Sequence, residues 1–125
     1  MIEILPVVDF AAVKQIVEER RIECAQPILL LASEQGKTVG GAAVTLTGSE
    51  PDSAELIDAW TVQEEDMPLF DGIVRAAASF LYERGKRKVV CRQEVLQKPL
   101  IAVGFHENDG ITVANLPQFF QKCKK

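Results

Sequence analysis

Residues 54–92 constrain the fold of this chain more than any other stretch. They contain an alternating strand pattern, AELIDAWTV, a short acidic loop, a long amphipathic pattern, PLFDGIVRAAASFLYERG, and a second strand pattern, KVVCR. Two strands joined by one helix in so few residues form a parallel crossover unit, in which the helix lies across one face of the sheet. The sequence therefore predicts that residues 54–62 and 88–92 are neighbouring parallel strands at the centre of a sheet.

The helix of this unit has clear signals at both ends. Pro68 falls in its first turn, where a missing N–H costs least, and Gly85 follows its last turn as a C-terminal cap. The loop before it places three acids near the positive end of the helix dipole: Glu64, Glu65 and Asp66. The apolar stripe of the helix is predicted to pack on the two strands through Leu69, Ile73, Phe80 and Leu81.

Before this unit, the chain is expected to form a short strand over residues 2–8, a helix and an antiparallel pair of strands. Asp9 is placed to cap the helix FAAVKQIVEERR, in which Phe10, Val13, Ile16 and Val17 recur at helical spacing. The apolar run ILLLASEQG and the segment TVGGAAVTLT form the antiparallel pair. Within the second of these, GG at positions 40 and 41 indicates a bulge or a close approach of neighbouring backbone.

After the unit, a short helix interrupted by Pro99 is expected to end at Gly104 and Phe105. A turn at residues 108–110, a last strand, ITVA, and a terminal helix over residues 116–125 follow. Phe119 and Phe120 are adjacent rings on this short helix and would form an apolar patch if they were exposed. We therefore expect both rings to be buried, either against the domain or against the second subunit of a homodimer.

The composition limits the classes of protein to which the chain can belong. With 125 residues, 47% of them hydrophobic, it fits one compact domain over residues 1–125. Its net charge of −4 does not favour nucleic acid or an anionic membrane as a partner. No apolar run approaches the length of a membrane span, and the start, MIEILPVVDF, has no basic leader, so a cytoplasmic protein is expected.

The cysteines give no indication of a metal site. Cys24, Cys91 and Cys123 are widely spaced and odd in number, so we expect reduced thiols and neither a zinc site nor a disulfide framework.

Strict alternation along AELIDAWTV places four residues on one face of the strand: Leu56, Asp58, Trp60 and Val62. Trp60 then either lines a ligand cleft or fills the core.

The order of these elements resembles the GNAT superfamily of N-acetyltransferases. The resemblance rests on the antiparallel pair ILLLASEQGKTVGGAAVTLT, the strand AELIDAWTV, the helix ending in FLYERG, the strand KVVCR and the helix ending in VGF, and it covers roughly residues 27–106. It implies an α/β (α+β) fold with a mixed, centrally splayed β-sheet flanked by helices. It also implies transfer of an acyl group from acetyl-CoA to an amine.

The resemblance places candidate functional residues. Val62, Met67 and Phe70 fall at positions that bind acetyl-CoA, and Asp58 falls where some members keep a carboxylate that acts as a base through water. Cys91 lies close to the path of the acyl chain in the family. The residues alone leave plainer interpretations open: Asp58 as a hydrogen-bonded strand residue, and Cys91 as a buried thiol.

His106 is the only histidine. It directly follows Phe105, so it could serve as a base. A histidine exposed in a surface turn is the alternative interpretation of the same position.

The loop before the central helix departs from the family pattern. Members carry Arg/Gln-x-x-Gly-x-Gly/Ala, whose backbone N–H groups hold the pyrophosphate of acetyl-CoA; aligned on Gly85, its two glycines fall on Pro68 and Phe70. Pro68 supplies no N–H, the ring of Phe70 would stand where the backbone must approach phosphate, and three carboxylates repel an anion. The family's acid, a tyrosine, falls on Leu100, which cannot donate a proton.

Two functions follow from these opposing indications. One is an acyl-CoA-dependent N-acetyltransferase that holds its cofactor in a non-standard way. The other is a non-catalytic descendant that binds another small molecule in the cleft between the central strands, or serves as a protein-interaction module. The loop chemistry predicts that acetyl-CoA binds weakly or not at all through residues 67–70, and that a ligand is neutral or cationic at that end.

Overall fold

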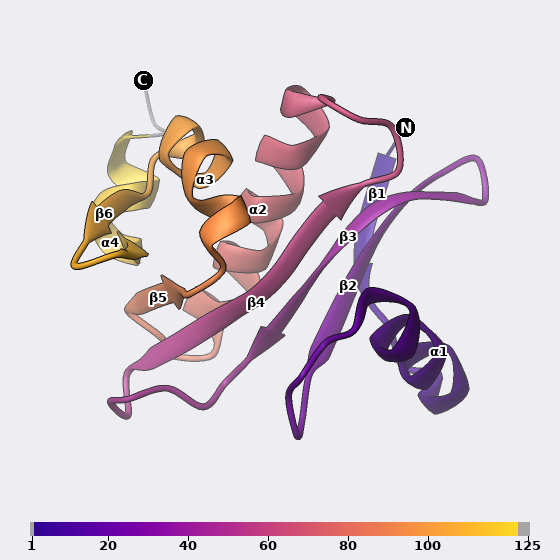
Figure 1. Ribbon diagram of the computed structural model, residues 1–125, viewed down its shortest axis with the longest axis horizontal. Helices are drawn as coiled ribbons and strands as arrows, with labels where there is room; N and C mark the ends of the chain where they lie inside the picture. The colour runs from indigo at the N-terminus through magenta and orange to yellow at the C-terminus, as the bar shows by residue number, and fades with distance from the viewer. Residues whose placement is uncertain (1, 123–125) are drawn as a thin grey trace.

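The computed structural model of the protein describes residues 2–122. Within them, one seven-stranded sheet has the order β1-β2-β3-β4-β5-β7-β6 (Figure 1). The strands are β1 (Ile2–Pro6), β2 (Ile28–Glu34), β3 (Lys37–Thr45), β4 (Ser53–Thr61), β5 (Lys88–Cys91), β6 (His106–Asn108) and β7 (Ile111–Asn115). The helices are α1 (Phe10–Arg20), α2 (Met67–Glu83), α3 (Gln97–Val103) and α4 (Leu116–Lys122), with the 3-10 helix η1 (Glu94–Leu96) before α3.

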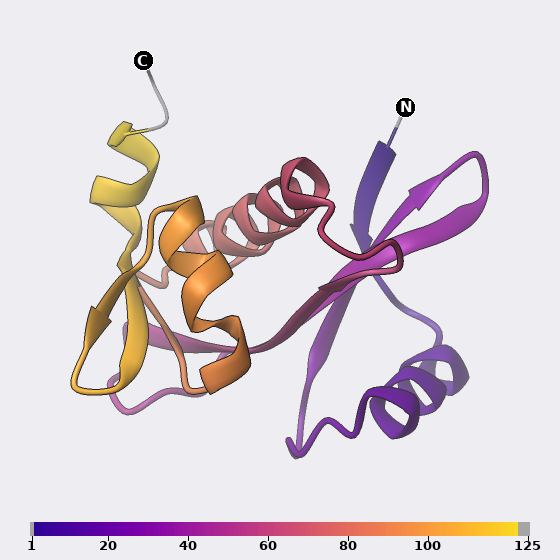
Figure 2. The same cartoon turned by 45° about the horizontal axis from the view of Figure 1, so that its top comes forward.

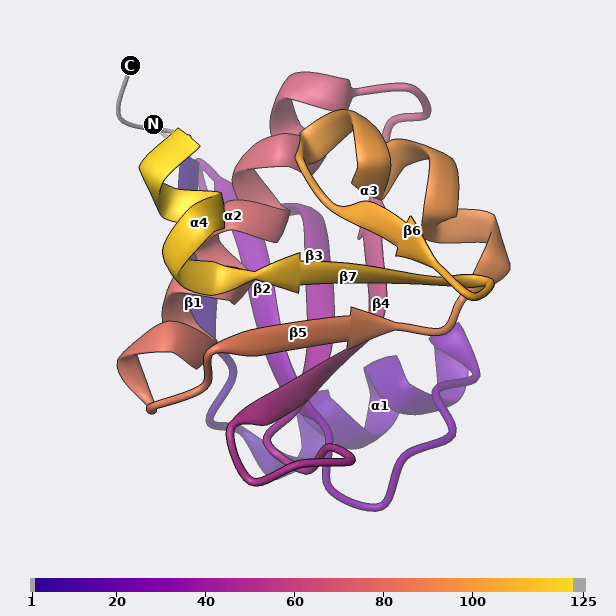
Figure 3. The same cartoon turned by 90° about the vertical axis from the view of Figure 1, so that its left-hand side faces the viewer.

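The predicted crossover unit is confirmed. β4 and β5 are parallel neighbours near the centre of the sheet, and all other neighbouring strands of the described sheet are antiparallel. β4 pairs with β5 only from Ser53 to Glu55, although it continues to Thr61, so the two strands separate (Figure 3). The mixed, centrally splayed sheet flanked by helices is therefore the observed fold.

The two longest helices cover opposite faces of the sheet (Figure 2). The main core lies under α2, where the buried helix residues are Phe70, Ile73, Val74, Ala77, Ala78 and Leu81. Leu69 and Phe80 are partly buried against the same cluster, so the predicted packing stripe is confirmed. A smaller cluster on the opposite face contains Leu29, Ala43 and Ile57, and α1 packs on it through Val13, Ile16 and Val17.

Phe10 is an exception on α1. The helical spacing predicts it on the apolar face, but it is 80% exposed. It is the first residue of the helix, three residues after the edge strand β1, and no strand within residues 2–122 lies beyond this edge to cover it.

The ends of α2 match the signals in the sequence. Asp66 caps the start of the helix with its side chain, and Pro68 lies in the first turn. At the other end, Gly85 has a φ of +85°, its N–H donates to the Tyr82 carbonyl oxygen, and the Lys86 N–H donates to the Leu81 carbonyl oxygen. This double hydrogen bond is a Schellman motif, which favours glycine at the left-handed position.

The C-terminal third departs from the prediction in two places. Pro99 does not interrupt a helix, because it lies in the first turn of α3, where its missing N–H leaves no helical bond unmade. His106 opens strand β6, which the sequence does not predict; β6 pairs with β7 across a tight turn at Asp109 and Gly110.

The terminal helix packs on its own chain. Phe119 is 4% exposed, and Phe120 is partly buried against the main core. Residues 123–125 of the predicted helix lie outside the described residues. No helix in residues 2–122 is both long and apolar enough to cross a membrane.

Candidate functional site

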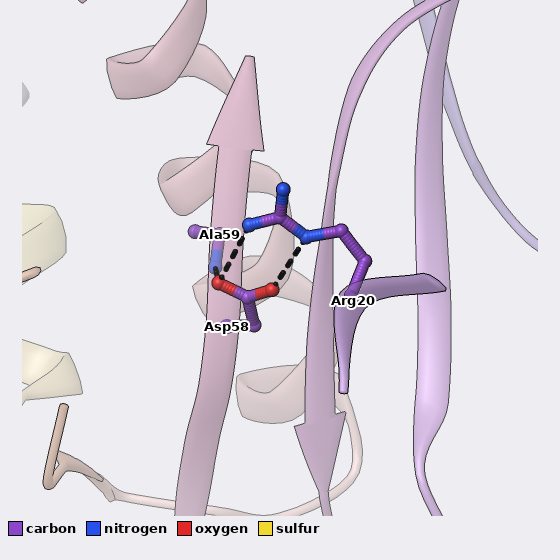
Figure 4. A network of polar contacts seen from close by, with 3 residues as sticks. All are labelled: Arg20, Asp58 and Ala59. Carbon is purple, nitrogen blue, oxygen red and sulfur yellow. Dashed lines mark hydrogen bonds and ion pairs between the residues drawn. The ribbon is translucent and has the colours of Figure 1, made fainter. Parts of the chain in front are cut away.

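Arg20, Asp58 and Trp60 form a polar cluster on the α1 face of the sheet. Arg20 is the last residue of α1; its Nε donates to Oδ2 of Asp58 at 2.8 Å and its Nη2 donates to Oδ1 at 3.2 Å (Figure 4). The Ala59 N–H also donates to Oδ1, at 2.9 Å (Figure 4). The same guanidinium lies 4.5 Å from the centre of the Trp60 ring, within cation–π range. Both oxygens of the candidate base are therefore engaged.

A β-bulge in β4 decides which side chains reach this cluster. The register with β3 shifts between Leu56 and Asp58, so Ile57 has no residue opposite it. Ile57 consequently packs on the α1 side, while Leu56 belongs to the core under α2. The predicted shared face of Asp58 and Trp60 is confirmed, since both contact Arg20, but the placement of Leu56 on it is wrong because strict alternation ends at a bulge.

A groove runs along α1 and β4, and the pair of Arg20 and Asp58 divides it. On one side lies a cavity of about 410 Å³ between α1 and the sheet, with Trp60 in its wall. On the other side lie two adjoining cavities of about 230 Å³ and 360 Å³, which share Arg21, Ile57 and Gln93. Trp60 therefore lines a cleft, one of the two alternatives that the sequence leaves open.

The larger of the adjoining cavities is rich in charge, and we call it the charged pocket. It is lined by Arg21, Glu23, Glu55 and Arg92, together with Leu56, Ile57 and Gln93. Nε of Arg92 lies 3.4 Å from Oε2 of Glu55. In residues 2–122, no hydrogen bond or ion pair engages the side chain of Arg21 or of Glu23.

The N-terminus of α2 already holds an anion of the protein itself. Oδ1 of Asp66 accepts from the Leu69 N–H at 3.2 Å. The Phe70 N–H donates to the carbonyl oxygen of Asp66 at 2.9 Å, and Pro68 has no N–H to offer. An external phosphate at this helix end would have to displace the Asp66 carboxylate.

The positions that the family resemblance marks for the cofactor lie at different depths. Val62 follows β4, its N–H donates to the Val39 carbonyl oxygen at 2.8 Å, and its side chain is 66% exposed. Met67, the first residue of α2, is 38% exposed. Phe70 is only 7% exposed and belongs to the main core. The prediction that its ring stands in the path of a phosphate is therefore wrong, and the obstacle at this helix end is Asp66.

The remaining candidate residues do not join the cluster. Leu100, at the position of the family's acid, is fully buried in the core. His106 is exposed at the start of β6, and Cys91 is buried in β5. Neither is hydrogen-bonded to Asp58 within the described chain. Residues 2–122 contain no group of three His, Cys, Asp or Glu side chains placed to hold a metal ion.

Cys91 should react slowly with alkylating reagents. Burial raises the pKa of its thiol above the ordinary value of 9.0, and a hydrogen bond with the Gln93 backbone offsets this only in part. Because only the thiolate is nucleophilic, the folded variant Cys24→Ser, Cys123→Ser should take up iodoacetamide at pH 8 far more slowly than the same variant in guanidinium chloride. Mass spectrometry measures both rates. Equal rates would show that Cys91 is accessible in the folded protein.

The sequence does not single out the arginines of this groove. Arg20 and Arg21 end a helix, where basic residues are favoured by the dipole alone, and Arg92 closes a basic strand end. Arg20 is paired with Asp58, 38 residues further along the chain, and a local sequence pattern cannot predict a contact over that separation. The one local signal is the pair RR directly after the apolar stripe of α1, where a helix more often ends in glycine.

Solved structures share this architecture. A Desulfovibrio desulfuricans protein assigned as a GNAT-family acetyltransferase has a TM-score of 0.72 and 11% identity, covering 93% of this chain and 99% of that chain. An Exiguobacterium sp. 255-15 protein assigned as an acetyltransferase has a TM-score of 0.71 and 9% identity, covering 100% and 99%. N-acetylglutamate synthase from Neisseria gonorrhoeae, complexed with coenzyme A and L-arginine, has a TM-score of 0.71 and 15% identity, covering 91% of this chain and 33% of that one.

These likenesses establish the fold. The chain has the fold of the GNAT acetyltransferases, as the order of its elements implies. No family model and no curated protein matches its sequence.

Proposed function

We propose that this protein binds a small molecule in the groove along α1 and β4, and that it does not hold acetyl-CoA at the N-terminus of α2. The observation that carries the proposal is the Asp66 carboxylate, which already caps that helix. The groove offers the alternative site, since its neighbouring cavities share lining residues and form a series from α1 to the end of β5.

The residues at the helix end do not fit the pyrophosphate of acetyl-CoA. A helix N-terminus carries about half a unit of positive charge, and a single carboxylate outweighs it. Here Glu64, Glu65 and Asp66 bring three negative charges to one short loop. Solvent screens part of their effect, but a further anion would still meet a negative field and would lack the N–H of Pro68.

The residues at the family's base and acid positions, Asp58 and Leu100, are poorly suited to proton transfer, which supports a binding function over catalysis. A general base needs a lone pair that its substrate can reach. Three hydrogen bonds, two from Arg20 and one from Ala59, occupy three of the four lone-pair sites of Asp58, and only one site on Oδ2 is left for a substrate. Leu100 stands where the family keeps its acid and has no proton to give.

Acyl transfer is the second candidate function, because one observation favours it. β4 leaves β5 after Glu55, which creates the splayed sheet shared with the GNAT acetyltransferases. N-acetylglutamate synthase from Neisseria gonorrhoeae, which has this fold, is complexed with coenzyme A. An acyl-CoA used by the present chain would have to be held away from the N-terminus of α2.

Calorimetry with acetyl-CoA at low salt tests the proposal. We expect no measurable binding by the natural chain, and a gain of binding when Glu64→Gln, Glu65→Gln and Asp66→Asn remove the three charges. Like-charge repulsion then ends, and a phosphate displaces a neutral Asn cap more easily than a carboxylate. Micromolar binding by the natural chain, with phosphates on the backbone of residues 67–70 in a crystal, would contradict the proposal and favour acyl transfer.

A further inference from the structure

We propose that the ligand of this groove is a zwitterion, a small molecule with both a carboxylate and a protonated amine, and that Arg21 binds its carboxylate. This inference rests on the proposed function, because it assigns a ligand class to the same groove. It follows from the balance of charges in the charged pocket.

The charged pocket presents both signs of charge in equal number. Two arginines, Arg21 and Arg92, and two glutamates, Glu23 and Glu55, line it. A ligand with charge of one sign only would meet as many like charges as opposite ones. A zwitterion can turn each of its groups toward a charge of the opposite sign, which is how charge complementarity produces specificity.

Two of these four charges are free to bind a ligand. Arg92 and Glu55 lie 3.4 Å apart and partly neutralise each other. The side chains of Arg21 and Glu23 have no hydrogen-bond or ion-pair partner in residues 2–122. A guanidinium can bind a carboxylate through two parallel hydrogen bonds, and a glutamate can accept from an ammonium group. The unmatched pair therefore has the two functions that a zwitterion needs.

The backbone of Arg21 provides a way to test its side chain with glycine. Its φ of +55° and ψ of +46° place it in the left-handed region at the end of α1. Its N–H donates to the Glu18 carbonyl oxygen at 3.3 Å, and the Ile22 N–H donates to the Val17 carbonyl oxygen at 3.0 Å. This is a Schellman motif, whose left-handed position favours glycine. An arginine here is less favourable for the backbone than glycine would be. Gln35, Glu65 and Asp109 share this conformation, and Arg21 differs from them because it lines the charged pocket.

The side chain of Arg21 lies where it can contact a ligand in either of two cavities. Arg21 lines both adjoining cavities, beside Ile57 and Gln93. The larger cavity, at about 360 Å³, is within the range of about 300–1,000 Å³ that small-molecule sites occupy. Ile57 offers an apolar surface to a ligand side chain, and the Gln93 amide can donate and accept hydrogen bonds.

The first experiment screens the standard L-α-amino acids by thermal shift and measures the strongest stabiliser by calorimetry. Each is compared with its carboxamide, which lacks the carboxylate, and with its N-acetyl derivative, which lacks the protonated amine. We expect at least one amino acid to bind and either derivative to bind at least about tenfold more weakly, because each leaves a charged side chain without its partner.

The second experiment replaces Arg21 with glycine, which suits the left-handed backbone. The unliganded Arg21→Gly variant should have an unchanged or higher melting temperature, because glycine relieves the strain. Its affinity for the amino acid should fall by about tenfold or more, whereas Arg21→Lys should retain part of the binding because it keeps the charge and loses the fork. Arg87→Ala removes an exposed arginine that does not line the groove and should leave the affinity unchanged.

The outcomes separate this inference from the proposed function. Amino acids that fail to bind at millimolar concentration, derivatives that bind as tightly as the zwitterion, or full affinity in Arg21→Gly would each overturn the inference. None of these results restores acetyl-CoA to the N-terminus of α2. The proposed function fails instead on the calorimetry with acetyl-CoA, which does not depend on Arg21.

Discussion

Replacing Gly40 with alanine should lower the free energy of unfolding by about 2–3 kcal/mol, the range expected when an atom is forced into a packed core. A Cβ at this position would lie 2.5 Å from the Trp60 carbonyl oxygen and 2.7 Å from Cδ1 of Ile73. The oxygen belongs to β4, the neighbouring strand, and Ile73 is fully buried in α2. Neither neighbour can move without shifting β4 or α2, so the substitution forces the two layers apart.

Urea unfolding followed by circular dichroism measures this loss, and Gly72→Ala provides a matched control. Gly72 lies inside α2, and apart from its chain neighbours and the nearby backbone of its own helix, no atom is within 4 Å of a Cβ added there. Because glycine is unfavourable in a helix interior, this change should raise the free energy of unfolding by about 0.5–1 kcal/mol. A Gly40→Ala variant as stable as the natural chain would show that β3 does not approach β4 and α2 this closely.

Local signals explain why the central unit could be predicted from the sequence. Pro68 and Gly85 mark the two ends of α2 through backbone chemistry that acts within one turn, and both have the predicted roles in the structure. The close approach at Gly40 and Gly41 is confirmed, and a bulge lies next to it, since Val39 has no residue opposite it on β2. These features depend on residues near each other in sequence, or on the absence of a side chain.

The features that the sequence does not reveal depend on long-range geometry. The bulge at Ile57 becomes visible only when β4 is laid against β3, and it separates Leu56 from the face of Asp58. The ion pair between Arg20 and Asp58 closes only when α1 lies across the sheet. Strand β6 is too short and polar to be distinguished from a loop until β7 pairs with it.

The candidate site shows the same division. The sequence gives the acids before α2 and the face shared by Asp58 and Trp60, because both follow from neighbouring positions. It does not show which of these acids caps the helix: the carboxylate of Asp66 does so, and the ring of Phe70 is buried in the core. The chemistry of that end follows from a side-chain rotamer, and a sequence pattern carries no rotamer.

Replacing Phe119 with alanine is expected to have the largest effect on stability, a loss of about 3–5 kcal/mol, as for other buried rings. The ring is 4% exposed and meets Phe105 edge-on at a centroid distance of 5.7 Å. It lies 5.3 Å from the ring of Phe120, and the guanidinium of Arg75 lies 5.1 Å from its centre. One substitution therefore removes the ring through which α4 contacts both α2 and the segment that follows α3. Since small domains have a total stability of about 5–15 kcal/mol, this loss would be a large fraction of the total and should lower the melting temperature clearly.

Phe120→Ala is the matched control, because the neighbouring ring on the same helix is only partly buried and packs on Tyr82 at 5.4 Å. Its loss should be smaller, about 1–2 kcal/mol, since the area returned to water is smaller. Urea unfolding measures both variants, and size-exclusion chromatography reports their oligomeric state. If Phe119 were instead held by a second subunit, Phe119→Ala would shift a dimer toward monomer with little change in the unfolding of each chain.

Deleting residues 117–125 exposes the same core surface and should lower solubility. A truncated chain that stays monodisperse with unchanged melting would contradict the packing assigned to α4.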